Sequence, residues 1–155
     1  MAGSVSKDYG AFMKLLMHDT KLMDLMAIAI VDQTNYTKLM TTYFIEAYSS
    51  NVVTQTALCR LLIHSAPVSA TNNPFVLEDS VVIEVFVPNG TTNGMDRVAG
   101  FERRSNQIVD RVIQLFHTKI INYKKIKLAA RHELSSGTDN FVRMYIRFTY
   151  LKVYP

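Results

Sequence analysis

The densest apolar pattern in the chain is a strand-like run over residues 80–88, Ser-Val-Val-Ile-Glu-Val-Phe-Val-Pro. This density of β-branched and aromatic residues is typical of a β-strand, and the Pro-Asn-Gly at its end favours a turn. After a polar stretch at 89–100, apolar residues recur at helical spacing over 101–121, with Ile120 as the last member of the stripe. The pattern predicts a strand, a loop and a helix that packs across a sheet.

The first 28 residues also carry a helical pattern. From Ser6, a residue type that caps helices, apolar side chains recur at helical spacing, and the pattern resumes after Asp19. We expect one helix broken near Asp19, or two short helices, with the methionines of this region filling the core. Residues 29–57 are polar and Thr-rich with one short apolar stretch, so we interpret them as an excursion or arm.

Three further segments alternate between apolar and polar residues, as strands with one buried face do. Residues 56–65 place Cys59, Leu61 and Ile63 on one face, and a long loop over 66–79 leads from there to the 80–88 strand in an antiparallel pair. Residues 124–134 and 142–150 alternate on either side of a Gly-containing turn, which predicts a hairpin with one basic solvent face. In its first strand, one face carries Ile126, Leu128, Ala130, His132 and Leu134.

These patterns predict a single α+β domain over residues 1–155. The domain has a mixed, mainly antiparallel β-sheet, helices packed on one face and a closing C-terminal β-hairpin. An N-terminal helical segment at 1–28 and the excursion at 29–57 precede an αβ core at 57–155. A chain of 155 residues suits one such domain.

Charge is distributed unevenly along the chain. Residues 1–96 contain five Lys and Arg against nine Asp and Glu, a net charge of −4, whereas residues 97–155 contain twelve against four, a net charge of +8. Acidic and basic surfaces of this kind suit head-to-tail association or contact with a polyanion. A solvated surface with an uneven composition is the alternative.

The sequence contains no familiar catalytic or nucleotide-binding motif. A metal site built from His64, His117 and His132 is conceivable, but ordinary histidines are the favoured interpretation, and the single Cys59 is expected to be inert. We therefore expect no enzyme activity, no cofactor and no metal. No export signal or membrane-spanning run is recognisable, so we expect the protein to remain where it is made.

Basic side chains on the last two predicted strands resemble a nucleic-acid-binding face. Only Tyr145 supplies an aromatic ring among them, which argues against recognition of single strands by stacking. A solvated sheet face, or a docking face for an acidic protein, fits equally well. The basic residues are Lys124, Lys125, Lys127, Arg131, Arg143 and Arg147.

The order of these elements resembles the tail terminator proteins of long-tailed bacteriophages, in particular the lambda-type terminator. The resemblance lies in Ile-Glu-Val-Phe-Val-Pro at 83–88 with its following loop and amphipathic helix, and in the Tyr-rich final strand Arg-Met-Tyr-Ile-Arg-Phe-Thr-Tyr at 143–150. It covers roughly residues 57–155 and the first helix. The polar stretch 29–57 and the basic C-terminal half depart from the family.

The resemblance implies a structural virion protein that forms a ring, usually of six copies, on the tail tube. Such a ring ends polymerisation of the tube and joins the tail to the head or neck, with genomic double-stranded DNA passing through its lumen. It implies as partners other copies of the chain, the tail tube protein and a neck or head-completion protein, without a membrane. The implied location is the virion, after assembly in the host cytoplasm.

Ring contacts of this kind fall on loops and sheet edges. One candidate loop has Asn72, Asn73, Pro74 and Phe75, and the other has Thr91, Asn93, Met95 and Arg97, while Arg103, Arg104, Lys124, Lys125 and Lys127 are candidate electrostatic partners. The alternatives are a small basic DNA-binding protein, another head–tail connector component, and an enzyme without a familiar motif.

Overall fold

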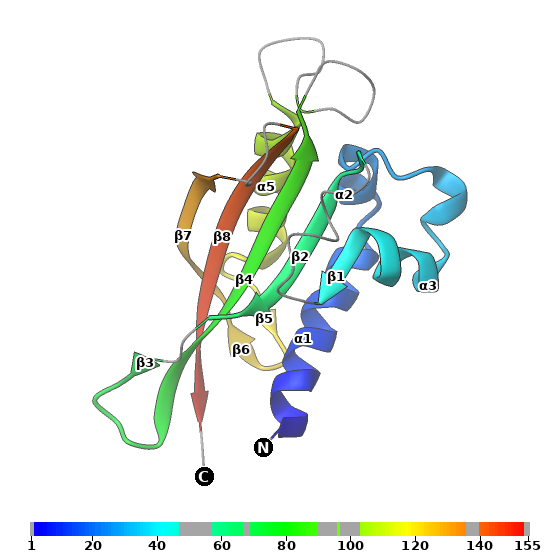
Figure 1. The fold of residues 1–155 in the computed structure, drawn as a ribbon. Helices are drawn as coiled ribbons and strands as arrows, with labels where there is room; N and C mark the ends of the chain where they lie inside the picture. Colours follow the sequence, from blue (N-terminus) through cyan, green and yellow to red (C-terminus); the bar gives the residue numbers. More distant parts are fainter. Residues whose placement is uncertain are drawn as a thin grey trace.

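A computed structural model describes residues 2–46, 57–66, 69–89, 96, 103–135 and 140–153. Its centre is a six-stranded sheet with the strand order β1-β2-β4-β8-β7, to which β3 adds by pairing with β4 (Figure 1). The strands are β1 (Phe44–Glu46), β2 (Arg60–Ser65), β3 (Ser69–Ala70), β4 (Val76–Pro88), β7 (Lys127–Leu134) and β8 (Phe141–Val153). Among the strands of the described ranges, β1 and β2 alone pair in parallel, so the predicted mixed, mainly antiparallel α+β fold is confirmed.

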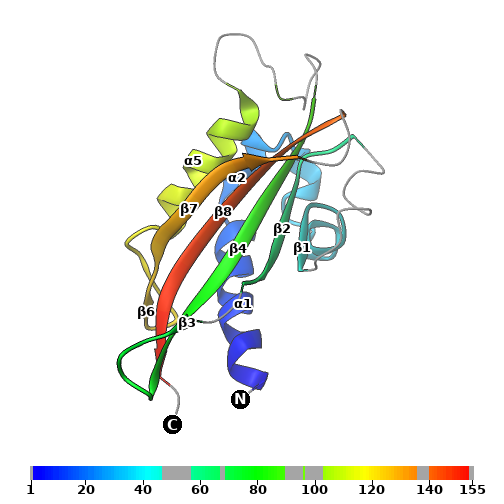
Figure 2. The same ribbon diagram turned by 60° about the vertical axis from the view of Figure 1, so that its left-hand side comes forward.

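Helices cover one face of this sheet, as predicted. Figure 2 shows α1 (Ala2–Met17), α2 (Thr20–Leu25) and α5 (Arg104–Phe116) on the same side of the strands. Alternate residues of β2, β4 and β8 meet these helices in one core. Its centre is aromatic, since the Phe12 ring lies 5.6 Å from Phe116 and 5.8 Å from Tyr150. Burial of the apolar side chains on this face of the strands therefore holds the helices on the sheet.

The predicted break in the N-terminal helix is confirmed at Asp19. Its Oδ1 accepts a hydrogen bond from the Leu22 backbone N–H at 2.7 Å, which caps α2. Beyond the C-terminal end of α2, Ala27 has a φ of 57°, and the N–H of Ala27 donates to Asp24 O while that of Ile28 donates to Met23 O. This is a Schellman motif with alanine at the left-handed position that glycine prefers.

The predicted helix over 101–121 is too long at its C-terminal end. Helix α5 begins at Arg104 and ends at Phe116, and Thr118 has a φ of 64° that no helix accommodates. Ile120 therefore does not continue the buried stripe; it lies in the short strand β5 (Ile120–Ile121) and is 73% exposed. Strand β5 pairs with β6 (Lys124–Lys125) in a separate two-stranded hairpin.

Part of the 29–57 segment belongs to the sheet and part forms a lobe beside it. We define the lobe as residues 29–43, which contain η1 (Ile30–Asp32), α3 (Tyr36–Lys38) and η2 (Leu39–Tyr43); it projects beyond the β1 edge in Figure 1. Strand β1 then pairs with β2 and buries Phe44 in the core. Residues 47–56 lie outside the described part of the chain.

The predicted hairpin of β7 and β8 is confirmed, but the predicted face of β7 is wrong over half its length. Leu128 pairs with Phe148 on the helix-covered face, whereas a β-bulge between Leu128 and Ala130 reverses the residues that follow. Ala130, His132 and Leu134 consequently lie opposite the helices, beside Arg147, Tyr145 and Arg143 respectively. Ile126 precedes β7 and is fully buried.

The predicted 66–79 loop is shorter than expected, because β4 begins at Val76. The first half of β4 extends away from the body of the molecule, where it pairs with β3 on one side and with the end of β8 on the other (Figure 1). We name residues 69–79 and 150–153 the arm. At its tip, Asn73 Oδ1 accepts a hydrogen bond from Phe75 N at 3.0 Å, which shapes the turn.

Candidate interaction surfaces

The acidic and basic halves of the sequence pair with each other inside the folded subunit. Buried or partly buried carboxylates from the first half bind cations from the second half: Asp8 with Lys124 and Lys152, Asp19 with Arg111, Glu84 with Arg143, and Asp96 with Arg103. The prediction of separate acidic and basic surfaces is therefore wrong for these charges. Sequence position alone could not show that the two halves interleave in one sheet.

Asp8 joins three parts of the fold. Its side chain is 1% exposed, and it accepts hydrogen bonds from Asn122 Nδ2 at 2.7 Å, Lys124 Nζ at 2.8 Å and Lys152 Nζ at 3.0 Å. Burial acts to raise the pKa of Asp8, but the hydrogen bonds from Lys124, Asn122 and Lys152 lower it below its ordinary value. The carboxylate thereby fixes α1 to the β5–β6 hairpin and to β8.

The predicted electrostatic contacts Arg103 and Arg104 both have partners within the subunit. Arg103 Nε donates to Asp96 Oδ2 at 2.6 Å and its Nη1 donates to Glu133 Oε2 at 2.9 Å. Arg104 Nη1 donates to the Leu25 carbonyl at 2.7 Å, at the end of α2. Their contacts hold α5 to its neighbours.

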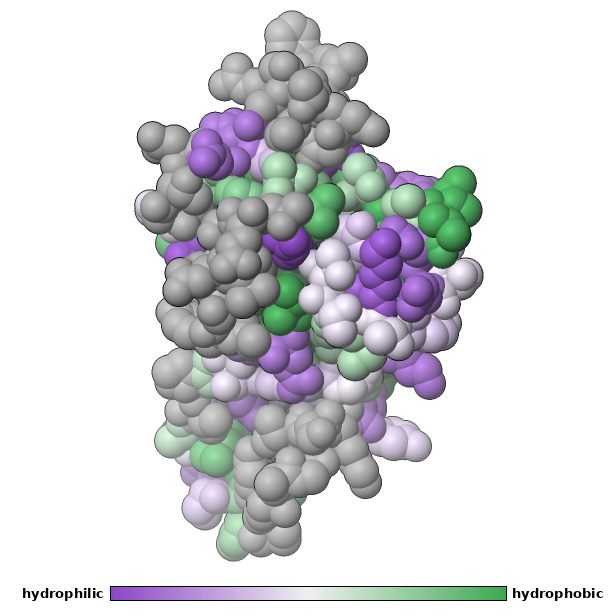
Figure 3. Space-filling view, turned by 45° about the vertical axis from the view of Figure 1, so that its right-hand side comes forward, coloured by the Kyte–Doolittle hydropathy of each residue, from purple (hydrophilic) through white to green (hydrophobic). Residues whose placement is uncertain are grey.

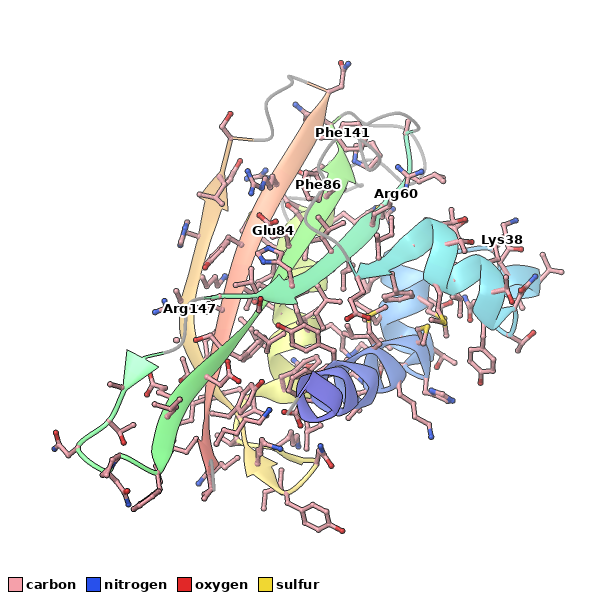
Figure 4. All side chains as sticks on the ribbon, turned by 60° about the horizontal axis from the view of Figure 1, so that its bottom comes forward. Lys38, Arg60, Glu84, Phe86, Phe141 and Arg147 are labelled. Carbon is pink, nitrogen blue, oxygen red and sulfur yellow. The ribbon has the colours of Figure 1, made fainter. Side chains whose placement is uncertain are left out.

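The centre of the sheet face opposite the helices carries a buried charged cluster. Glu84 is 2% exposed and accepts hydrogen bonds from His64 Nε2 at 3.1 Å and Arg143 Nε at 2.8 Å. Figure 4 shows Glu84 and Phe86 on this face of β4. The cluster lies in a groove of about 560 Å³ whose wall includes Tyr145.

In this cluster, the protonation states of His64 and Glu84 depend on each other. The hydrogen bond to Glu84 raises the pKa of His64, although burial acts in the opposite direction. Burial acts to raise the pKa of Glu84, but the hydrogen bonds from His64 and Arg143 lower it overall. Hydrogen bonds from Arg143 and His64 therefore compensate the negative charge of Glu84, which explains how a carboxylate is buried at the centre of the sheet.

The other predicted chemical groups do not converge within the described ranges. His117 Nδ1 accepts a hydrogen bond from Leu128 N, and the His132 ring stacks on Tyr145, so the three histidines considered for a metal lie apart. No group of three metal-ligating side chains occurs among the described residues. Burial raises the pKa of the Cys59 thiol to about 12, which leaves it protonated at neutral pH.

Large exposed hydrophobic side chains gather in two places on the described surface. One group lies on the lobe: Ile30, Val31, Tyr36 and Met40. The other lies on the arm and the β5–β6 hairpin: Phe75, Ile120, Tyr123, Leu151 and Val153. Figures 1 and 2 place the lobe and the arm on opposite sides of the molecule. Clustering of this kind marks interaction surfaces.

A groove of about 460 Å³ lies between the arm and the hairpin. We name it the basic groove, because three lysines and only one carboxylate line it. Its lining residues are Glu78, Tyr123, Lys124, Lys125, Lys127, Thr149, Tyr150 and Leu151. The predicted contact residues Lys124, Lys125 and Lys127 thus meet at one site.

The two predicted contact loops have different outcomes. Asn72, Asn73, Pro74 and Phe75 form the exposed tip of the arm, with Phe75 62% exposed. Thr91, Asn93, Met95 and Arg97 lie outside the described residues. Sequence reasoning missed Ile30, Val31 and Tyr123; the signal for the first two was an Ile-Val pair in an otherwise polar stretch.

The fold and these surfaces define a class: a mixed α+β protein with helices on one sheet face and apolar clusters on two opposite sides. None of the helices in the described ranges has the length and apolar character needed to cross a membrane. The chain belongs to the YomW family, whose model matches residues 11–150, and this family is associated with bacteriophages. No curated protein matches the sequence.

Proposed function

We propose that this chain is a tail terminator subunit of a long-tailed bacteriophage. In this role, copies of the chain form a ring, of six in our proposal, that caps the tail tube and joins it to the head or neck. Its partners are other copies, the tail tube protein, a neck or head-completion protein and the double-stranded DNA in the lumen. The mature protein resides in the virion.

One observation carries the proposal most strongly: all nine large exposed hydrophobic side chains of the described residues fall on two opposite surfaces. A subunit that contacts neighbours on two sides needs two such surfaces, whereas single scattered side chains would need no explanation. The phage association of the YomW family and the α+β fold agree with this role. The role we propose is structural and not enzymatic.

The test is a phage that carries a nonsense mutation in this gene. Because a terminator ends tube growth and makes the joint, we expect electron micrographs of the lysate to show unattached DNA-filled heads and tails of abnormal length. Purified wild-type protein added to the lysate should restore joined particles. Normal-length tails attached to heads in the mutant lysate would refute the proposal.

A small DNA-binding protein is the second candidate, favoured by the exposed Lys125 and Lys127 beside the Tyr123 ring. For this function we expect duplex DNA to bind with an affinity that falls steeply with salt. Titration of labelled duplex at several salt concentrations measures that slope. A tail terminator that only encircles DNA would show weak binding and a shallow slope.

A further inference from the structure

We propose that the lobe of one copy docks into the basic groove of the next copy, through Ile30 and Val31 on the lobe and Tyr123 in the groove. This inference rests on the proposed ring function and identifies the contact that would build the ring. Its occupant is a second copy of this chain.

The lobe presents its apolar tip on a braced turn. Ile30 and Val31 are 83% and 80% exposed, and Figure 3 shows a green apolar patch at the outer end of the lobe. Gln33 Nε2 donates to Asp24 Oδ1 at 2.8 Å and to the Ile28 carbonyl at 3.1 Å, which ties the turn back to α2. Because the turn is already ordered, docking would cost little conformational entropy.

The lobe is also anchored at its base. Leu39 is fully buried in the core, and Asp32 pairs with Lys38 at 3.1 Å across the lobe. Tyr36 bonds to His18 Nε2 at 3.1 Å and so connects the lobe to the end of α1. The projecting lobe is therefore part of the rigid fold, and its exposed pair has a fixed position relative to the sheet.

The groove presents an aromatic side chain in an unfavourable backbone conformation. Tyr123 is 98% exposed at φ 64°, and it follows Asn122 at φ 50° in a two-residue hairpin turn. Turns with positive φ at both positions strongly favour Asn-Gly, so tyrosine costs about 1 kcal/mol of subunit stability here. Nothing within the described subunit covers this ring, and aromatic residues are frequent anchors of protein interfaces.

The groove is preformed as well. Asp8 holds both Asn122 and Lys124 by hydrogen bonds of 2.7 and 2.8 Å, which fixes the hairpin that carries Tyr123. Leu151 adds a second exposed apolar wall from the arm. The groove therefore offers an apolar surface with a rigid frame to an incoming apolar pair.

Charged side chains that form no salt bridge within the described part of the subunit favour this contact. Asp24 and Glu46 lie beside the lobe and have no cationic partner in a salt bridge among the described residues. Lys125 and Lys127 line the groove without a carboxylate partner among the described residues, against the single Glu78. When the lobe of a second copy docks, its carboxylates therefore approach the lysines of the basic groove, and its apolar tip approaches the apolar side chains Tyr123 and Leu151.

The two surfaces differ from each other and lie apart in the fold, the lobe beside the edge strand β1 and the basic groove beside the β5–β6 hairpin and β8. A contact between unlike surfaces is heterologous, and repetition of it produces either a closed ring or an open filament. In a closed ring, each copy would engage both of its surfaces at once, so the ring would be more stable than a dimer held by a single contact.

The test uses two variants that each damage one surface. The lobe variant is Ile30→Asp with Val31→Asp, and the groove variant is Tyr123→Gly with Lys125→Glu. We expect the wild-type chain to form oligomers by size-exclusion chromatography with light scattering, and each variant alone to be monomeric. An equimolar mixture should form a 1:1 dimer that does not grow, because each variant retains the surface that the other lacks.

Tyr123→Gly alone separates docking from folding. We expect its melting temperature to rise, because glycine fits the turn, while its association constant falls at least about tenfold. Lys14→Glu is the control, an exposed residue on α1 that belongs to neither the lobe, the arm nor the groove, and it should leave association unchanged. Circular dichroism and light scattering give the two measurements.

Three results would overturn the inference. They are a wild-type chain that stays monomeric up to its solubility limit, a variant mixture that stays monomeric, and a groove variant that loses duplex DNA binding but still oligomerises. Failure of the proposed function is recognised separately. If the variants complement each other in vitro but the mutant lysate contains normal joined tails, the contact is correct and the tail terminator role is wrong.

Discussion

Ala27 occupies a position at which the backbone of the folded protein favours glycine. Its φ of 57° follows from the Schellman motif that ends α2 and buries Ile28 and Met23. We expect Ala27→Gly to raise the free energy of unfolding by about 0.5–1 kcal/mol, since the relief of strain exceeds the added entropy of the unfolded chain. Urea unfolding measures the difference.

The neighbouring Ala29 is the control for this prediction. It has a φ of −57°, where alanine is unstrained, so Ala29→Gly should lower the free energy of unfolding. Equal effects of the two substitutions would show that the left-handed backbone at Ala27 is not the cause.

His64 makes the stability of the protein depend on pH. Its pKa is raised in the folded state by Glu84, so its contribution is complete below the ordinary value of 6.5 and is lost as pH rises through the raised pKa. Arg143 and Tyr145 also face this site, and Arg143 opposes the shift. We expect the free energy of unfolding to fall as the pH rises from the ordinary value of 6.5 through the raised pKa of His64.

The control for this pH dependence is His64→Gln, which keeps a hydrogen-bond donor but does not titrate. Urea unfolding of this variant should give a flatter profile over the same range. A wild-type profile that matches the variant would mean that the histidine does not change its protonation on unfolding.

At the scale of elements, Asp96 determines how α5 begins. Its Oδ1 accepts a hydrogen bond from Ser105 N at 2.9 Å, and its Oδ2 accepts one from Arg103 Nε. We expect Asp96→Ala to lower the free energy of unfolding by about 2–4 kcal/mol, since it removes a cap and a buried charge partner. Guanidinium unfolding provides the measurement.

Asp110 provides a matched comparison on the same helix. Its side chain is 58% exposed and pairs with Arg131, so Asp110→Ala should cost less than about 1 kcal/mol. If both substitutions had the same small effect, Asp96 would not be the cap that the geometry indicates.

The elements that the sequence predicted correctly have strong local patterns. Strand β8 alternates without interruption, and the apolar β4 has both faces buried over most of its length, so their side-chain periodicity was sufficient. The bulge after Leu128 was invisible because Ala130 fits either face. Strand β1 was missed because three residues give no period and its pairing with β2 is non-local.

The interaction surfaces were harder to predict than the fold. Lys124, Lys125 and Lys127 were found from charge, but their meeting with Leu151 depends on the pairing of β7 with β8, in which Lys127 lies opposite Thr149. Tyr123 could not be found, because its exposure follows from a turn conformation that its residue type disfavours.

For the whole molecule, Asp8 is the carboxylate that joins α1, the β5–β6 hairpin and β8 to one another. We expect Asp8→Asn to lower the free energy of unfolding by about 3–5 kcal/mol, because it removes the buried carboxylate that accepts hydrogen bonds from Lys124 and from Lys152, which is only 5% exposed. Chemical unfolding measures this loss.

A second substitution tests the physical cause. Adding Lys152→Met to Asp8→Asn removes the buried ammonium group that the Asp8 carboxylate balances in the wild type, so the double variant should recover part of the stability that the single variant loses. Additive losses would show that the two side chains are not coupled.

Strand β8 lies inside the sheet between β4 and β7, although it follows both of them in the sequence. During synthesis, β4 leaves the ribosome well before β8, the strand with which it pairs along its whole length. Asp8 is made even earlier relative to its partner Lys152. The polypeptide therefore cannot reach its native state stepwise as it emerges. A nascent chain stalled before residue 141 should remain protease-sensitive throughout, and native structure should be acquired in one late event.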